Sequence, residues 1–431
     1  MNVQTATPAR LEPPATMRWL MLFFVSVAMF GNYYIYDSIS PLADVLKNQL
    51  GFADADIGTL NGIYSLPNVV MVLIGGIIID RIGTRKSILI FSVLCVLGAV
   101  ITTLEGSLWT MASGRLVFGL GAESMIVAIT TALAKWFRGK ELSFAFGLNL
   151  TLARLGSFAA LNSPTWARDF YSHWQGPLWI ATVIGLSCIV GAVIYWMLEA
   201  QAERNYALGQ SDEPDKIIFR DILKFSTSYW LIVGLCATFY SAIFPFQTFA
   251  VKFFIEAHGT TREMGGFLSS MLTLFAMICT PLFGLFADRI GKRSHLMILG
   301  SLLLLPVYLV MAYLPINLWV PMSLMGIAFS LIPAVMWPSV AYVVEESRLG
   351  TAYGLMTMLQ NVGLSGFNFM IGWANDFSQA GPDNPGGYAL GMWLFSILGF
   401  LGLFFAIQLN RVEAGPKSHG LDTITVKSSR G

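Results

Sequence analysis

The segment GRLVFGLGAESMIVAITTALAKWFRGKELSFAFGLNLTLARLGS, residues 114–157, contains the most informative pattern in the sequence. Two apolar stretches, each long enough to cross a bilayer as a helix, flank a short basic turn. Glu123 lies 15 positions before Arg138, and Arg154 lies 13 positions after Glu141. At about 1.5 Å of rise per helical residue, both charges lie roughly 20 Å from the same membrane face. The sequence therefore predicts an acid and a base near mid-membrane depth.

Charges at that depth are costly, and two interpretations of this pair remain open. A charge in the middle of a bilayer costs on the order of 3 kcal/mol or more, so such residues usually mark a substrate or ion pathway. Glu123 and Arg154 would then contact a substrate. The alternative is a salt bridge between them that holds two helices together.

The composition of the whole chain is that of a membrane protein. Of its 431 residues, 55% are hydrophobic and 12% are charged, about half the charged fraction of a soluble domain. The net charge of +1 gives no reason to expect a nucleic-acid partner. The four cysteines lie in apolar runs and the four histidines lie in loops, near span ends or in the C-terminal tail. We therefore expect no metal site, no cofactor and no catalytic residue, and hence no enzyme.

Twelve apolar segments follow the N-terminal tail. Each reaches the ~20 residues that a membrane-spanning helix needs. We therefore predict an all-α membrane protein with twelve transmembrane helices, and we expect a monomer in the lipid bilayer. The predicted spans are 18–42, 56–79, 86–104, 108–134, 142–165, 177–198, 228–254, 263–287, 294–313, 317–344, 350–374 and 387–409.

The longest polar stretch between spans divides the chain into two halves of six helices. If the even-numbered turns and both tails face the cytoplasm, 20 of the 26 lysines and arginines lie on that side. The positive-inside rule therefore places both termini in the cytoplasm. The predicted organisation is a tail at 1–17, a six-helix half at 18–198, a linker at 199–227, a second six-helix half at 228–410 and a tail at 411–431.

A ten-residue pattern recurs at corresponding turns of the two halves. GIIIDRIGTR at 76–85 and GLFADRIGKR at 284–293 share G-x-x-x-D-R-I-G-x-R with an offset of 208 positions. Repeated parallel halves are typical of carriers that expose one central site to each side of the membrane in turn. A mere positive-inside anchor would explain the arginines but not the recurring aspartate and glycine.

The repeated pattern resembles the cytoplasmic signature of the major facilitator superfamily, and the resemblance covers both halves. In that superfamily, the aspartate and arginines join the two halves when the cytoplasmic side is closed. The resemblance therefore implies a gating role for the matching residues here. These are Asp80, Arg81, Gly83 and Arg85 in the first half, and Asp288, Arg289, Gly291 and Arg293 in the second.

Longer segments resemble one branch of that superfamily, which contains lysosomal dipeptide transporters (major facilitator superfamily domain-containing protein 1). The matching segments are NYYIYDSISPL at 32–42, residues 62–83, most of 114–157, and GTAYGLMTMLQNVGL at 350–364. The resemblance implies that Glu123 holds the ammonium of a dipeptide and Arg154 its carboxylate. The function we expect is transport of dipeptides, recognised by their two charged ends.

Polar and aromatic residues in other spans lie at a depth that fits a shared cavity, although each could instead pack inside the bundle. Asp37 is ~19 residues into the first span, roughly 28 Å along it, so we expect it near the outer mouth as a gating residue. Arg115 begins its span as in the superfamily and is read as structural. The further substrate-binding candidates are Tyr33, Tyr34, Tyr64, Asn68, Tyr240, Trp337, Gln360 and Asn361.

Motifs that the sequence lacks predict the mode of energy coupling and the membrane in which the protein resides. The E-x-x-E-R motif of proton-coupled peptide carriers is missing, and Glu123 is the only carboxylate expected at mid-depth, so uniport is favoured over proton symport. The only N-x-S/T sequon, at 149–151, lies inside a span. We therefore expect a prokaryotic relative in the inner (plasma) membrane. A carrier of amino acids or small carboxylates and a receptor-like protein without transport remain alternatives.

Overall fold

The computed structural model describes residues 13–425 except 138–140, 207–223, 346–347 and 417. Long apolar helices dominate this part of the chain, because a backbone in lipid must satisfy its hydrogen bonds within each segment. The N half begins at α1 and ends at α9. Its elements are α1 (Ala15–Asp37), the 3-10 turn η1 (Ser40–Leu42), α2 (Ala43–Leu50), α3 (Asp54–Ile63), α4 (Ser65–Ile82), α5 (Thr84–Leu104), α6 (Leu108–Phe137), α7 (Leu142–Leu161), α8 (Ser163–Trp166), η2 (Arg168–Ser172) and α9 (Gln175–Asn205).

The C half begins at α10 and ends at α16. Its predicted span at 294–313 is interrupted near Pro306, because proline cannot donate the hydrogen bond that would continue the helix. The elements are α10 (Thr227–His258), α11 (Arg262–Ile290), α12 (Arg293–Leu304), α13 (Val307–Tyr313), α14 (Trp319–Val343), α15 (Leu349–Phe377), η5 (Pro385–Tyr388) and α16 (Ala389–Glu413).

Ten helices of the described residues are long and apolar enough to cross a membrane. The helix pair Asp54–Met71 and Ile74–Ile82, bent by 58°, raises this number to 11 if it is one span. The remaining predicted span, 350–374, corresponds to α15, a helix of 29 residues. This helix carries Gln360, Asn361, Asn368 and Asn375, which lower its hydropathy. It packs against α3 and α4 of the N half. The predicted fold class, an all-α membrane protein, is confirmed.

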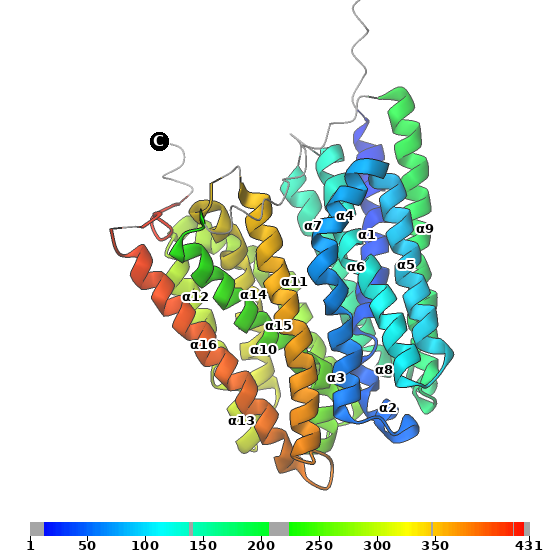
Figure 1. Cartoon of the computed structure of the whole chain (residues 1–431), viewed down its shortest axis with the longest axis vertical. Helices are drawn as coiled ribbons and strands as arrows, with labels where there is room; N and C mark the ends of the chain where they lie inside the picture. Colours follow the sequence, from blue (N-terminus) through cyan, green and yellow to red (C-terminus); the bar gives the residue numbers. More distant parts are fainter. Residues whose placement is uncertain (1–12, 138–140, 207–223, 346–347, 417, 426–431) are drawn as a thin grey trace, which may run out of the picture.

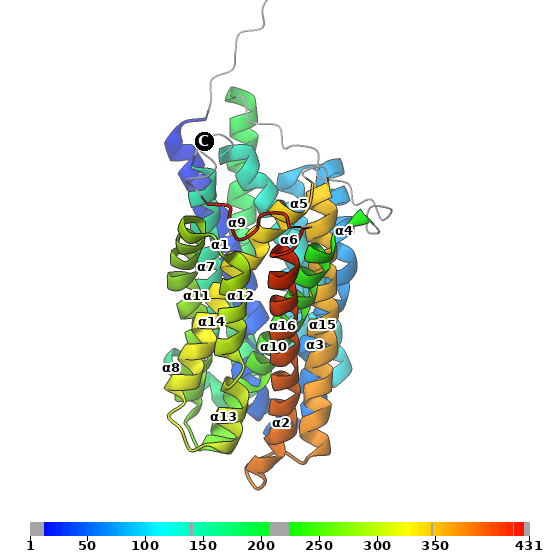
Figure 2. The ribbon, with the colours of Figure 1, turned by 90° about the vertical axis from the view of Figure 1, so that its left-hand side faces the viewer.

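The two halves stand side by side as separate helical bundles (Figures 1 and 2). Their helices diverge toward the end of the molecule at which α1 begins and α16 ends, here called the terminal face. They converge toward the opposite end, here called the distal face, where α2, α8 and α13 lie. Each half has its own apolar core: one cluster lies within residues 21–202, and the other is built mainly from residues 229–421.

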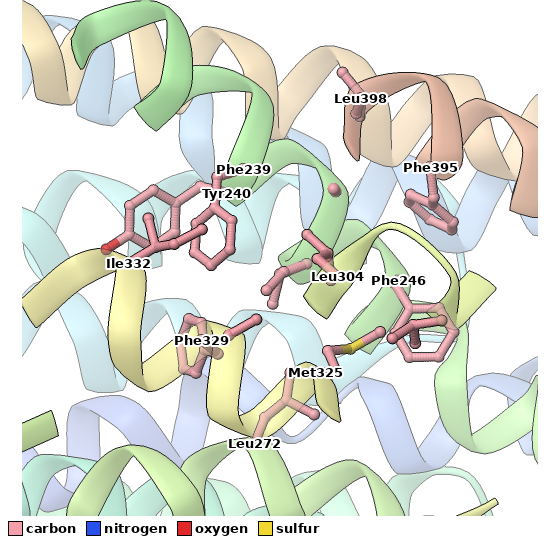
Figure 3. Close-up of a cluster of buried hydrophobic side chains, with 14 of the residues drawn as sticks. Phe239, Tyr240, Phe246, Leu272, Leu304, Met325, Phe329, Ile332, Phe395 and Leu398 are labelled. Atoms are coloured by element: carbon pink, nitrogen blue, oxygen red, sulfur yellow. The ribbon is translucent and has the colours of Figure 1, made fainter. Parts of the chain in front are cut away.

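The C-half core is packed largely with aromatic and branched side chains. Figure 3 shows Phe239, Phe246 and Phe329 among methionine and leucine side chains of neighbouring helices. Phe246 contacts the ring of Tyr308 with centroids 5.5 Å apart and that of Phe395 with centroids 5.9 Å apart. Such close packing makes the C half a rigid unit.

Glycines allow the two halves to approach closely near the distal face. A Cβ on Gly58 of α3 would lie 2.2 Å from the carbonyl oxygen of Asn368 in α15. A Cβ on Gly266 of α11 would lie 2.2 Å from the carbonyl oxygen of Leu161 in α7. Gly58 and Gly266 are 208 positions apart, the same offset as the repeated pattern. The internal repeat therefore extends to the two helix contacts that join the halves, α3 with α15 and α7 with α11, here called the seams.

Candidate functional site

A cavity of about 210 Å³ lies between the halves. The N half contributes residues of α1, α6, α7 and the α3–α4 junction, and the C half contributes residues of α10, α11, α14 and α15. The lining residues are Asn32, Tyr33, Tyr36, Asp37, Tyr64, Ala122, Glu123, Ile126, Leu150, Arg154, Ser157, Tyr240, Phe244, Gln247, Thr273, Phe329, Gln360, Asn361 and Leu364.

Glu123 and Arg154 both line this cavity, from α6 and α7. Glu123 accepts a hydrogen bond from the hydroxyl of Tyr64 at 3.4 Å. The Arg154 guanidinium lies 5.4 Å from the ring centroid of Phe329, which belongs to the other half. No ion pair joins the two charges within the part of the chain that the structure describes. The arrangement leaves an acid and a base on one wall, each able to accept an external partner.

Aromatic rings form much of the remaining surface. Tyr36 and Tyr64 lie with centroids 4.8 Å apart on the N-half side. On the C-half side, Tyr240 stacks on Phe244 at 5.6 Å, and both rings contact Phe329. Tyrosines combine an apolar face with a polar hydroxyl, so this surface can contact varied side chains.

The structure brings seven of the ten substrate-binding candidates to the cavity wall: Tyr33, Tyr64, Glu123, Arg154, Tyr240, Gln360 and Asn361. The other three lie behind it. Tyr34 is buried against Phe30 and Trp166. Asn68 donates to Asn361 Oδ1 at 3.4 Å, and Trp337 Nε1 donates to the Tyr240 hydroxyl at 2.9 Å. Asn68 and Trp337 therefore support lining residues.

Several lining residues were not singled out from the sequence. Ser157 follows Arg154 by three positions and Tyr36 follows Tyr33 by three, so helical spacing alone could have found them. Gln247 and Thr273 are polar residues in apolar spans, a weaker signal of the same kind. Phe329 carried no signal, because a phenylalanine in an apolar span is ordinary.

Asp37, expected near the outer mouth, lies on the cavity wall at the end of α1. It also lines a smaller neighbouring cavity with Ser40 and Thr248, toward the distal face. The central cavity therefore contains a second carboxylate besides Glu123. Asp37 thus lies between the central cavity and the distal contacts of the two halves. The gating role expected for it stays a prediction.

Arg115 is almost completely buried and holds the N-half backbone in place. Its guanidinium donates to the carbonyl oxygens of Ile35, Tyr36 and Leu60 at 3.1, 3.1 and 3.3 Å. It also donates to Asn61 Oδ1 at 3.0 Å. These bonds satisfy carbonyls near the end of α1 and within α3, which positions the tyrosines beside Glu123.

The repeated pattern forms a tight turn in each half, on the terminal face. Gly83 and Gly291 have φ angles of +83° and +71°, which favour glycine at both positions. In the N half, Arg85 pairs with Glu203 of α9 at 3.1 Å. In the C half, Arg293 pairs with Asp288 at 2.9 Å. These ion pairs lie within one half each. Asp80, Arg81 and Arg289 belong to the same turns.

The C-half turn is covered by the segment that follows α16. Arg293 donates to the carbonyl oxygen of Ile424 at 2.6 Å and lies over the ring of Tyr342. Asp422 accepts hydrogen bonds from the backbone N–H and the hydroxyl of Ser294. The partners of Arg293 and Arg85 therefore differ, although the turns repeat.

Among the described residues, no group of three or more His, Cys, Asp or Glu side chains is placed to hold a metal ion. The cavity instead offers fixed charges, hydroxyls, amides and rings to an organic molecule. Two helical halves around such a cavity define the class of membrane transporters.

Comparison with known proteins specifies the class further. The family description Major Facilitator Superfamily matches residues 22–368 and 235–422. The chain belongs to the major facilitator superfamily. It is 35% identical over 371 residues to the lysosomal dipeptide transporter MFSD1 of Danio rerio, covering 82% of this chain and 80% of that protein. It is 34% identical over 384 residues to the Homo sapiens protein of that name, covering 85% and 82%.

Solved structures show the same fold at low sequence identity. A bacterial homologue of the human lysosomal transporter Spinster, in an inward-facing and occupied conformation, aligns with a TM-score of 0.71 at 15% identity. The alignment covers 93% of this chain and 98% of that one. The family match and the relatives at 34–35% identity confirm the predicted resemblance to this superfamily and to its dipeptide-transporter branch. The roles of individual site residues stay predictions.

Proposed function

We propose that this protein is an alternating-access transporter that moves dipeptides by recognising their two charged ends. The observation that carries the proposal is the placement of Glu123 and Arg154 on one cavity wall without an ion pair between them. The names of the relatives at 34–35% identity point to the same substrate class.

End recognition suits this cavity because every dipeptide is a zwitterion with fixed ends and variable side chains. A carboxylate can accept from the ammonium, and the forked guanidinium can donate twice to the carboxylate. The rings of Tyr240, Phe244 and Phe329 then contact the side chains without selecting one chemistry.

The proposal includes an orientation and a gate. Both termini lie in the cytoplasm of a prokaryotic cell, so the terminal face, where the helices diverge, opens inward (Figure 1). The turns at 80–85 and 288–293 then lie at the cytoplasmic mouth and join the halves when that mouth closes.

Facilitated uniport is the proposed mode of transport, because Glu123 must stay charged to hold an ammonium. One observation favours proton symport as a second candidate. Asp37 lines the same cavity, so the ammonium and a transported proton could use different carboxylates. The two modes differ in whether an imposed proton gradient drives accumulation.

The test compares matched ligands and one isosteric variant. Glu123→Gln should weaken binding of dipeptides with a free N-terminus by about ten- to a hundred-fold, since charge-assisted contacts are worth roughly 1.5–3 kcal/mol. N-acetylated dipeptides should bind weakly to the wild type and lose little more in the variant. Affinity is measured through thermal stabilisation by the ligand. Equal losses for free and acetylated peptides would contradict end recognition.

A further inference from the structure

Two ion pairs with largely buried carboxylates join the halves at the distal face, away from the central cavity. Lys252 of α10 lies 2.8 Å from the carboxylate of Asp54, the first residue of α3, and both side chains are at most 1% exposed. Arg262, the first residue of α11, pairs with Asp44 of α2, with side chains 28% and 7% exposed. Neither pair is needed to line the cavity, yet each buries charge where the halves meet.

The two pairs are copies of each other under the internal repeat. Asp44 and Lys252 are 208 positions apart, and so are Asp54 and Arg262. This is the offset of the repeated turns and of the seam glycines Gly58 and Gly266. An acid of the N half therefore pairs with a base of the C half at two sites related by the symmetry of the fold. This repetition points to a role in holding the two halves together.

The buried pair is built so that it can separate. Within its own half, Lys252 also lies 3.1 Å from the carboxylate of Glu256 and donates to the hydroxyl of Tyr388 at 2.9 Å, so it would keep these partners if the halves parted. Asp54 keeps Lys47 of its own half at 3.9 Å. Because every charge retains a partner, separation avoids the large cost of an isolated buried ion.

Backbone contacts surround this pair and depend on the same approach of the halves. Asp376 of α15 accepts hydrogen bonds from the N–H groups of Asp54 and Ala55 at 2.8 and 2.7 Å, which caps α3 from the opposite half. Asn375 donates to Asp54 Oδ2 at 3.1 Å. Ser40 donates to the carbonyl oxygen of Gln247.

We propose that the pairs Asp54–Lys252 and Asp44–Arg262 form a two-point latch that closes the distal face and releases in each transport cycle. The inference rests on the proposed function in one respect only, namely that the halves move during transport. The latch sets how often the distal face opens in the absence of any substrate.

The experiment measures the opening directly in the full chain in lipid nanodiscs. Spin labels on cysteines at Asn48 and Asp383 report the distal face, and labels at Glu141 and Ile290 report the terminal face, in a background with the four native cysteines replaced by alanine. Asp54→Asn should raise the ratio of distal-open to distal-closed molecules about ten-fold or more, because it removes a charge-assisted contact between the halves. The terminal-face distance should shorten in the same molecules.

Three further variants separate a latch from a loss of packing. Lys252→Met should cause a similar shift, and adding it to Asp54→Asn should add little, because both remove one pair. Asp44→Asn should cause a smaller shift, since that pair is more exposed. Arg168→Gln is the control: its pair with Glu263 also joins the halves, but Arg168 is 80% exposed, so little change is expected.

The outcomes distinguish the latch from the transport function. Unchanged distances in folded Asp54→Asn and Lys252→Met proteins would overturn the latch, even if dipeptides stabilise the wild type. Melting temperatures confirm the fold of each variant, and a lower melting temperature without any change in distances counts against the latch. If no dipeptide stabilises the wild type but the distances shift as expected, the latch holds and the proposed substrate is wrong.

Discussion

The two walls of the central cavity differ in charge. The N half contributes Asp37, Glu123 and Arg154, whereas the described lining residues of the C half are neutral: Tyr240, Phe244, Gln247, Thr273, Phe329, Gln360, Asn361 and Leu364. On the proposed function, one half recognises the constant ends of the ligand and the other accommodates its variable side chains. Substitutions on the two walls should therefore differ in how much affinity is lost and in whether the loss depends on a free end of the dipeptide.

The largest effect is expected on the charged wall. Arg154→Ala should weaken binding of dipeptides with a free carboxylate by about ten- to a hundred-fold, because it removes a charge-assisted contact. C-amidated dipeptides should bind the wild type and the variant about equally weakly in thermal-shift titrations. A similar loss for both ligand series would show that Arg154 acts through stability, as in a structural salt bridge, and would break the distinction between the walls.

Charges outside the cavity should affect rate rather than affinity. Asp80→Asn or Asp288→Asn should slow dipeptide transport into liposomes by about three- to ten-fold, since partly exposed ion pairs are worth ~1 kcal/mol. Affinity should stay within a few-fold, because both residues lie on terminal-face turns. Loss of binding with normal turnover would show that these turns contribute to the site and not to the gate.

Smaller effects are expected on the neutral wall. Tyr240→Phe removes a hydroxyl that accepts from Trp337, and Gln360→Ala removes an amide. Each should lower affinity by about two- to five-fold, since a neutral hydrogen bond contributes ~1 kcal/mol. The loss should be the same for free and end-blocked dipeptides in the same titrations. A loss confined to one blocked end would assign end recognition to both halves.

No effect is expected from a proton gradient. Uptake by liposomes should follow the dipeptide gradient alone, because a Glu123 that binds an ammonium cannot also carry a proton. Accumulation against the dipeptide gradient, abolished by an uncoupler, would contradict uniport. Asp37→Asn would then be compared with Glu123→Gln to show which carboxylate of the charged wall carries the proton.

The sequence predicts the fold well because its signals are local. Apolar runs long enough to cross a bilayer, and a pattern repeated after 208 positions, can be recognised without knowledge of the tertiary contacts. Glu123 and Arg154, predicted from helical rise to lie at one depth, line the same cavity. The predicted domain bounds stay predictions, and the linker at 199–227 falls partly outside the described residues.

Parts of the site depend on side-chain direction, which composition does not encode. Tyr33 and Tyr34 are neighbours in sequence, but only Tyr33 faces the cavity, because consecutive helical residues point about 100° apart. Lys252 looked like an ordinary basic residue at a span end and is instead fully buried against Asp54. Such a partner, 198 positions away, becomes visible only when the two halves are placed together.

The latch residues also bear on which halves can associate, because the two signs of charge are divided between the halves. Both acids, Asp44 and Asp54, belong to the N half, and both bases, Lys252 and Arg262, belong to the C half. The N half is synthesised before the C half. If two N halves met through this seam, the repeat would place Asp44 of one chain against Asp54 of the other, and like charges repel at such short range. Two C halves would bring lysine against arginine. The charges thus favour assembly of each N half with a C half over aggregation between identical halves.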